Sequence, residues 1–144
     1  MPMTKLQRRI NYFKGLYGEW LSEFYFRLIG YHVLARRYRS RYGEIDLIVA
    51  KKLTKSGHQR NYKKLAFVEV KTYRLAANDP TAALGAVSVK AQKRIKQTAA
   101  QFLQQSPDLL VEEMRFDVVV VSPPVWLSHL RVAFDPLMSD PKAL

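Results

Sequence analysis

Two segments of the chain place charged side chains inside stretches of apolar residues. The first is Gly43-Glu44-Ile45-Asp46, and the second is Phe67-Val68-Glu69-Val70-Lys71. Charges inside a hydrophobic element are costly unless they serve a purpose or find a partner. Two carboxylates and an amine at one end of a sheet are able to hold a divalent cation and to polarise a phosphate. The pattern therefore indicates the chemistry of a nuclease.

Both segments alternate apolar with charged residues, as β-strands do because their side chains point to opposite faces in turn. In the second segment Glu69 and Lys71 share a face. In the first, the alternation predicts that Asp46 shares a face with Glu44 and Ile48. The opposite face is predicted to carry three apolar residues, Ile45, Leu47 and Val49.

The expected cofactor is Mg²⁺ or Mn²⁺, because oxygen ligands suit these ions and leave coordination positions open for substrate. Asp46 and Glu69 are the candidate ligands, and the backbone carbonyl of Val70 is near enough in sequence to join them. Lys71 is able to orient the attacking water or stabilise the transition state. Glu19, from a preceding helix, is expected to complete the ligand shell of the metal, directly or through a water, and joins the candidate catalytic set. On spacing alone, Glu69 and Lys71 are equally compatible with an ordinary exposed ion pair.

The chain has 144 residues and no cysteine. This length favours one domain over residues 1–144, with 1–10 and 135–144 loosely held. The absence of cysteine excludes disulfides, thiolate zinc sites and a cysteine nucleophile. The N-terminus lacks the apolar core of a signal peptide, and no apolar run is long enough to span a bilayer. We therefore expect a cytoplasmic protein without a membrane partner.

The net charge of +12 is confined to one half of the sequence. Residues 1–74 contain 17 Lys and Arg against 5 Asp and Glu, whereas residues 75–144 contain 7 of each sign. A basic field of this size attracts phosphate polymers largely regardless of base sequence. An even distribution would favour simple solubilisation of the surface, so the asymmetry favours nucleic acid as the partner.

Hydrophobic periodicity predicts a mixed α/β protein with a central sheet between helices. A helix is expected over 11–29, where apolar residues recur every three or four positions, and a second over 87–103. Strands are expected over 31–37, 44–50, 65–71, 115–122 and 130–134, with a long loop over 51–64 and a second loop over 75–80.

The densest basic patch is expected to grip backbone phosphates just before the first charged strand. It consists of Arg36, Arg37, Arg39 and Arg41, interleaved with Tyr38 and Tyr42. Tyrosines in such a patch are able to stack on exposed bases. A merely solvated strand and turn remains the alternative. Two further residues, Arg74 and Lys90, join the expected phosphate contacts.

Two other groups of residues are assigned no catalytic role. Asp117 is expected to pair with Arg115 or a backbone group rather than to act as a further metal ligand. The three histidines have no metal-ligand spacing; they are His32, His58 and His129.

The order of several motifs resembles the YraN family of small bacterial proteins. The motifs are Gly15-x-x-Gly18-Glu19-x-x-Ser22, Gly30-Tyr31-x-Val33-Leu34, Arg39-x-x-x-Gly43-Glu44-Ile45-Asp46, Phe67-Val68-Glu69-Val70-Lys71 and Arg115-Phe116-Asp117-Val118-Val119. They cover about residues 12–122. That family is similar to archaeal Holliday-junction resolvases and to the PD-(D/E)xK nuclease-like superfamily.

The resemblance implies a restriction-endonuclease-like fold and carries the superfamily's metal-binding Asp to Asp46. It also carries the Glu and Lys of the E-x-K motif to Glu69 and Lys71, and the upstream helical Glu to Glu19. Because resolvases act on two-fold symmetric junctions, a homodimer is implied by the same analogy.

Two functions are compatible with these observations. The first is a divalent-metal-dependent endonuclease acting on DNA, with branched DNA as one possible substrate. The second is a nucleic-acid-binding protein that keeps the fold but does not cut. The intact set of Asp46, Glu69 and Lys71 favours the enzyme, because a pure binder of polyanions has no use for buried acids.

Overall fold

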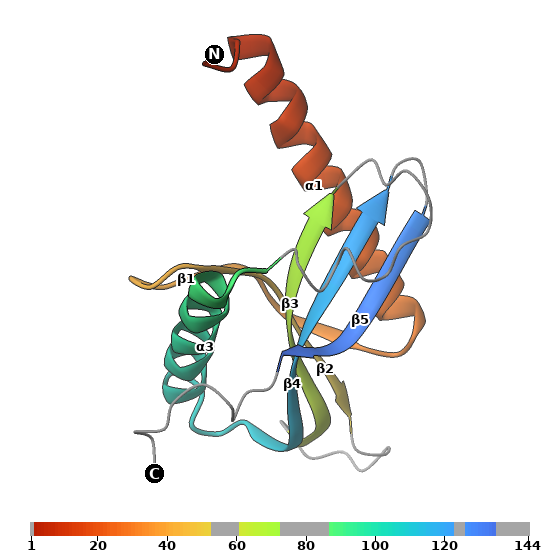
Figure 1. Ribbon diagram of the computed structural model, residues 1–144. Coiled ribbons are helices and arrows are strands. Elements are labelled where there is room, and N and C mark those ends of the chain that lie inside the picture. Colours follow the sequence, from red (N-terminus) through yellow and green to blue (C-terminus); the bar gives the residue numbers. More distant parts are fainter. Residues whose placement is uncertain (1, 53–60, 73–86, 123–125, 135–144) are drawn as a thin grey trace.

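The computed structural model describes residues 2–52, 61–72, 87–122 and 126–134. Five strands form one sheet, and the described helices lie on either side of it (Figure 1). In chain order the elements are α1 (Lys5–Leu28), β1 (His32–Arg39), β2 (Glu44–Lys52), β3 (Asn61–Thr72), α3 (Val89–Gln104), β4 (Leu110–Ser122) and β5 (Trp126–Phe134). The predicted α+β class with a central mixed sheet is confirmed, and the arrangement is consistent with a restriction-endonuclease-like fold.

The strands lie side by side in the order β1-β2-β3-β4-β5. All neighbours are antiparallel except β3 and β4, which are parallel along eleven paired positions, from Asn61 with Leu110 to Thr72 with Val121. Parallel neighbours need a crossover connection, and here the crossover contains α3. The loop predicted over 51–64 is wrong at its ends, because residues 51–52 belong to β2 and residues 61–64 to β3, and its middle, 53–60, lies outside the described residues. The loop predicted over 75–80 also lies outside them, as do Arg74 and residues 135–144.

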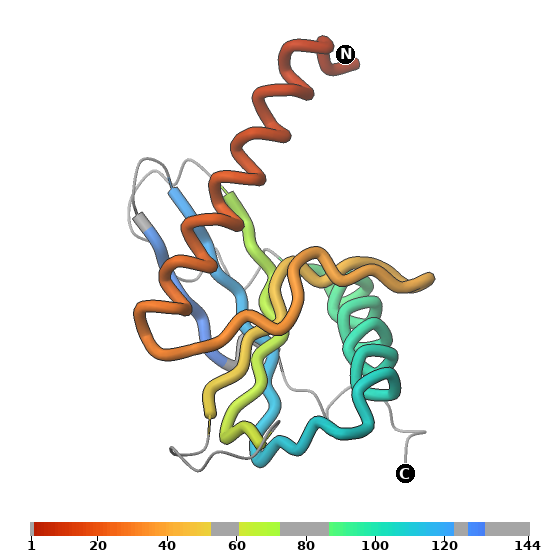
Figure 2. The backbone as a smooth tube through the Cα atoms, turned by 180° about the vertical axis from the view of Figure 1, so that it is seen from behind, coloured from red at the N-terminus to blue at the C-terminus, as the bar shows by residue number. Residues whose placement is uncertain are grey.

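Two hydrophobic clusters cover the two faces of the sheet. On one face α3 contributes Ile95 and Phe102, which pack with Phe67 of β3. On the other face α1 contributes Phe26, which packs with Val68 of β3. The run of four valines in β4 is buried throughout, as expected for a strand covered on both faces. Figure 2 shows α1 crossing the face opposite α3.

Helix α1 begins at Lys5, six residues earlier than its apolar periodicity predicts. The Thr4 hydroxyl accepts a hydrogen bond from the Gln7 backbone N–H at 3.1 Å and so caps the first turn. Residues 5–10, which lie in the segment expected to be loosely held, are therefore helical. This first part of α1 projects beyond the edge of the sheet (Figures 1 and 2).

The strands also extend past their predicted ends, because pairing with a neighbour continues into polar residues. Strand β3 starts at Asn61 rather than 65, and β4 starts at Leu110 rather than 115. In this stretch the two strands pair with each other, beginning with Asn61 opposite Leu110. Neither described helix combines the length and the apolar character that crossing a membrane requires.

A buried polar network joins α1 to β4 and β5 on the face of the sheet that α1 covers. Arg115 Nε donates to both carboxylate oxygens of Asp117, at 2.9 and 3.0 Å, which confirms the predicted pairing. The same carboxylate lies 2.7 Å from His129 Nε2, and the other ring nitrogen lies 2.9 Å from the Tyr25 hydroxyl. Arg115 also donates to the Tyr31 hydroxyl at 2.7 Å. The role of His129 has no signal in the sequence, because its partners are remote along the chain.

Candidate active site

The alternation of faces in β2 breaks at Asp46. Ile45 packs with Ile48 in the cluster beside α3, whereas Leu47 packs in the cluster beside α1. Asp46 and Leu47 both line a hollow against α1. The prediction that Ile45 and Leu47 share a face is therefore wrong, and so is the prediction that Asp46 shares a face with Ile48.

The cause of the break lies on the neighbouring strand. Arg36 pairs with Leu47 and Tyr38 with Ile45, so Arg37 lies opposite Asp46. Arg37 has a φ of +46°, a left-handed conformation that interrupts the pleat of β1. As a result two consecutive side chains of each strand point toward α1, and the Asp46 carboxylate is brought to the site.

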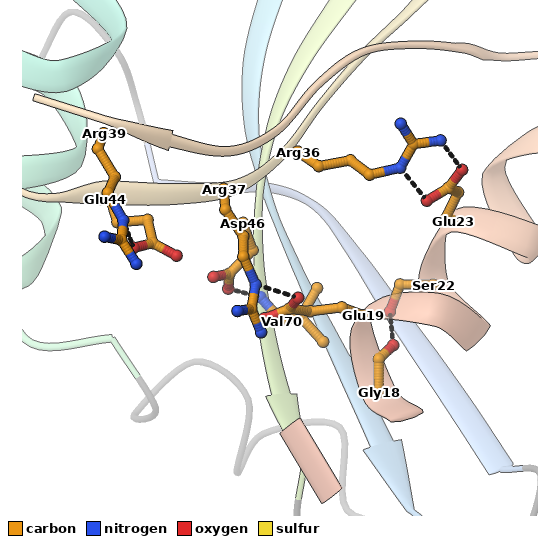
Figure 3. Close-up of polar contacts among 10 residues, drawn as sticks. All are labelled: Gly18, Glu19, Ser22, Glu23, Arg36, Arg37, Arg39, Glu44, Asp46 and Val70. Carbon is orange, nitrogen blue, oxygen red and sulfur yellow. Dashed lines mark hydrogen bonds and ion pairs between the residues drawn. The ribbon is translucent and has the colours of Figure 1, made fainter. Parts of the chain in front are cut away.

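The Asp46 carboxylate lies at the end of the β2–β3 ladder. Regular pairing ends with Leu47 opposite Val68. Directly beyond that pair, Val70 N–H donates a hydrogen bond of 2.8 Å to Asp46 Oδ2 (Figure 3). Glu69, the residue before Val70, forms an ion pair with Lys71, with Nζ 3.3 Å from Oε1. The structure thus brings Asp46, Glu69 and Lys71 together, as predicted from their spacing.

Two acidic groups crowded in a half-buried position hold their protons unusually tightly. Burial, followed by the negative charge of Glu69, raises the pKa of Asp46 to about 7, against the opposing hydrogen bond from Val70. Burial also raises the pKa of Glu69, although Lys71 opposes this shift. A bound divalent cation would remove the repulsion and favour the ionised forms of both carboxyls.

Glu19 reaches the same place from α1, where it is engaged by an arginine. Arg37 Nε donates to Glu19 Oε2 at 2.8 Å, beside the contact between Asp46 and Val70 (Figure 3). The negative charge of Glu19 contributes to the raised pKa of Asp46. Gly18 allows this approach, because a Cβ there would lie 2.2 Å from the Thr72 hydroxyl of β3.

A hollow of about 400 Å³ opens between α1 and the first two strands, next to Asp46. Its lining residues are Leu16, Glu19, Trp20, Glu23, Arg36, Arg37, Asp46 and Leu47. Its walls therefore combine two arginines, three carboxylates and an exposed tryptophan. Such a mixture is able to hold a phosphate beside an apolar or aromatic group.

The described residues contain no group of three or more histidine, cysteine or acidic side chains gathered closely enough to hold a metal ion. A site with two carboxylates still suits Mg²⁺, which usually keeps several waters and takes one or two protein carboxylates. Asp46 and Glu69 fit that requirement. Val70 contacts Asp46 through its N–H, and Glu19 is occupied by Arg37. The donor set is thus compatible with the ion, with solvent or substrate supplying the remaining ligands.

Most of the expected phosphate-binding arginines are paired with acids. Arg36 binds Glu23, Arg37 binds Glu19, and Arg39 Nε lies 2.9 Å from Glu44 Oε2. The partners of Arg36 and Arg37 were missed because these acids lie on α1, which is remote from β1 along the chain. The Arg39 contact also gives Glu44 a structural role.

The other expected phosphate contacts differ from these three arginines. Arg41 lies over the ring of Tyr42, with 4.9 Å between its guanidinium carbon and the ring centroid. Lys90 is exposed in the first turn of α3. Arg74 lies outside the described residues.

Comparison with known proteins identifies the family. The model of "Uncharacterised protein family UPF0102" matches residues 18–121. The chain belongs to the UPF0102 (YraN) family. It is 38% identical over 128 residues to a UPF0102 protein of Chelativorans sp. (strain BNC1), covering 89% of this chain and 92% of that protein.

Two further relatives cover most of the chain. A UPF0102 protein of Mesorhizobium japonicum is 37% identical over 127 residues, which is 88% of this chain and 90% of that protein. One of Parvibaculum lavamentivorans is 38% identical over 122 residues, which is 85% and 81% respectively. The matched segment contains Glu19, Asp46, Glu69 and Lys71, so the candidate site is part of the UPF0102 domain.

Proposed function

We propose that this UPF0102 protein is a cytoplasmic, divalent-metal-dependent endonuclease that hydrolyses phosphodiester bonds in DNA, with branched DNA as a candidate substrate. The observation that carries the proposal is the crowded pair Asp46 and Glu69. Burial raises the pKa of both groups, the negative charge of Glu69 adds to the shift at Asp46, and an amine lies 3.3 Å from Glu69. Strongly perturbed carboxyls next to a positive charge are typical of catalytic sites.

Each residue of the site has a distinct role in this proposal. Asp46 and Glu69 would hold Mg²⁺ or Mn²⁺, with the Val70 carbonyl as a further candidate ligand. When bound, the ion supplies charge stabilisation and an acidified water. The Lys71 ammonium would stabilise the negative charge that develops on the phosphoryl oxygens, or orient the attacking water. The pair of Arg37 with Glu19 would position the phosphate at the edge of the hollow.

A nucleic-acid-binding protein without catalysis is the second candidate. It is favoured by the lack of a cluster of three metal ligands among the described residues. The basic first half of the chain would serve either function, because counterion release drives both. Cleavage therefore has to be measured separately from binding.

The test compares a labelled four-way junction with a linear duplex of matched sequence, in the presence of Mg²⁺ or Mn²⁺. Wild type is compared with Asp46→Asn, which preserves an oxygen acceptor for Val70 N–H but removes the charge. Glu113→Gln, on the exposed part of β4, is the matched control for loss of one carboxylate. We expect metal-dependent cutting by wild type and Glu113→Gln, reduced at least about 100-fold in Asp46→Asn. Binding without cutting by any of the three proteins would refute the enzyme and support the binding protein.

A further inference from the structure

A largely exposed apolar stripe runs along α1 beside the face that packs on the sheet. Six large side chains recur at alternating steps of four and three residues; they are Leu6, Ile10, Phe13, Tyr17, Trp20 and Phe24, hereafter the α1 seam. A strict alternation of three and four is the heptad spacing of helices that pair along a common line. The seam extends over nearly three heptads, or roughly 27 Å of helix.

Most of the seam is exposed to solvent. Leu6, Phe13 and Trp20 are 68%, 62% and 62% exposed, and Phe24 is 51% exposed. The face of α1 that packs on the sheet contains Gly18, Ser22 and Phe26, which are buried, with Leu21 and Tyr25 partly buried beside them; of the seam residues, Tyr17 also packs against this cluster. At 3.6 residues per turn the seam lies about a third of a turn around the helix from that buried face. A second helix therefore has room to lie along the seam without displacing the sheet.

The projecting part of α1 has no covering element of its own among the described parts of the chain. It carries four basic residues before Gly15 and no acid, although positive charge is unfavourable near a helix N-terminus. A helical stretch of about a dozen residues is marginal in water unless its apolar side is packed. A partner that buries the seam and supplies negative charge would satisfy both requirements.

We infer that the α1 seam pairs with the α1 seam of a second copy, with the two helices antiparallel. This contact makes a homodimer whose interface is the same surface on both copies. The proposal does not rest on the proposed nuclease activity, because none of Asp46, Glu69 and Lys71 takes part in the contact; the seam residue Trp20, however, also lines the hollow beside Asp46.

The charges flanking the seam determine the direction. A parallel pair would place Arg9 of one helix beside Lys14 of the other, since these positions flank successive seam residues. An antiparallel pair instead brings the basic first half of each helix beside the second half of its partner, so that Arg9 faces Glu23. Glu23 also binds Arg27 and Arg36. The two copies of Lys14 meet once at the centre of this pair, whereas a parallel pair has the contact of Arg9 with Lys14 twice. The two helix dipoles also oppose each other in this orientation, which is favourable.

Of the possible partners, the second copy fits the seam best. A nucleic acid would bind the basic side of α1 but not a line of six apolar residues. A helix lying on a membrane surface would present a broad apolar face, whereas a stripe confined to heptad positions is the narrower line of a coiled coil.

The test is sedimentation of the full chain over a range of concentrations. Phe13→Glu places a charge at the centre of the seam, and Asn11→Glu adds the same charge at an exposed position on another side of α1. We expect a wild-type dimer, an unchanged dimer for Asn11→Glu, and a dissociation constant raised roughly 30-fold or more for Phe13→Glu. Far-ultraviolet circular dichroism verifies that both variants are folded.

Several outcomes would overturn the inference. One is a wild-type monomer at all concentrations, and another is a Phe13→Glu dimer as tight as wild type. A monomer that binds vesicles of anionic phospholipid through Phe13 would instead assign the seam to a membrane surface.

The orientation is tested by cross-linking, because the chain contains no cysteine of its own. Lys14→Cys lies near the middle of the seam, where an antiparallel pair brings the two copies of a residue together. Leu6→Cys lies at one end, where the two copies are separated by most of the seam. A flexible bis-maleimide should therefore link Lys14→Cys into a dimer and leave Leu6→Cys monomeric. Equal linking of both variants would indicate parallel helices and overturn the antiparallel arrangement.

Discussion

At Asp46 the local environment favours the protonated carboxyl. The ordinary pKa of 3.8 rises to about 7 in the folded chain, first through burial and then through the charge of Glu69. Between these two values the unfolded chain has already lost the proton that the folded chain retains. Stability therefore falls as the pH rises from about 4 to about 7, and above that it remains at the lower level.

Asp46→Asn should remove this dependence in protein kept free of divalent metal by a chelator. Near pH 4 the variant and wild type should have similar unfolding free energies. At pH 8 the variant should be more stable, by on the order of 2 kcal/mol. Urea denaturation at both pH values measures the difference, with Glu113→Gln as the control that should follow wild type. A constant difference across the pH range would show that Asp46 titrates normally.

Divalent metal should offset the loss of stability that ionised Asp46 causes, because a cation favours the ionised carboxyls. We expect Mn²⁺ at 100 times its dissociation constant to stabilise wild type by about 2.7 kcal/mol. Asp46→Asn should lose most of this stabilisation, whereas Glu44→Gln should retain it, because Glu44 pairs with Arg39. A thermal shift titration with and without the metal gives the measurement. An equal shift in wild type and Asp46→Asn would place the metal elsewhere.

The left-handed backbone of Arg37 is a second residue-scale feature with a measurable consequence. A β-branched side chain is strained at a φ of +46°, whereas asparagine adopts this region readily. Arg37→Val should therefore be less stable than Arg37→Asn by about 1–2 kcal/mol. Both variants lose the ion pair with Glu19, so the comparison isolates the backbone. Equal midpoints and slopes in urea denaturation would mean that the strand relaxes at no cost.

At the scale of elements, the approach of α1 to β3 depends on Gly18. A Cβ at this position would lie 2.2 Å from the Thr72 hydroxyl, whereas at Gly15 there is nothing within 4 Å. Gly18→Ala should destabilise the protein by about 1–3 kcal/mol through overpacking. Gly15→Ala should instead stabilise it by about 0.5–1 kcal/mol, because alanine favours the helix.

Metal binding by the two glycine variants tests whether the position of α1 also determines the geometry of the site. Because Gly18 precedes Glu19, displacement of α1 should weaken metal binding in Gly18→Ala but not in Gly15→Ala. Adding Thr72→Ala removes the hydroxyl that the new methyl group would meet and should restore both properties. If the double variant remains as defective as Gly18→Ala, the steric explanation fails.

The elements themselves could be predicted from the sequence, because each strand and helix has a clear hydrophobic period. The start of α1 was missed because its first turns, in which Leu6 and Ile10 stand among basic residues, do not pack on the sheet and begin at the Thr4 cap. The break at Asp46 was missed because it depends on an arginine in a left-handed conformation, for which no glycine or asparagine gives a signal.

Spacing alone predicted that Asp46 and Glu69 meet. The acids that neutralise Arg36 and Arg37 come from α1 and could not be predicted without the fold.

At the scale of the whole molecule, the positive charge is concentrated in the first half of the chain, and no single element accounts for it. The net charge of +12 belongs to residues 1–74, which build α1 and the first three strands. The second half is neutral and supplies α3, β4 and β5. A polyanion is therefore expected to approach from the side of α1 and β1, where the hollow beside Asp46 opens.

This asymmetry predicts how the affinity for a DNA duplex depends on salt. Each phosphate contact contributes about −0.9 to the slope of log affinity against log salt concentration. Arg41→Ala should reduce the steepness by about one unit, because Arg41 stacks on Tyr42 and leaves its charge to the ligand. Arg36→Ala should reduce it less, because Arg36 is already bound to Glu23. Fluorescence anisotropy at several salt concentrations measures these slopes, with Arg131→Ala in the neutral half as the unchanged control. A slope that responds equally to all three substitutions would mean that DNA contacts the molecule without preference for its basic side.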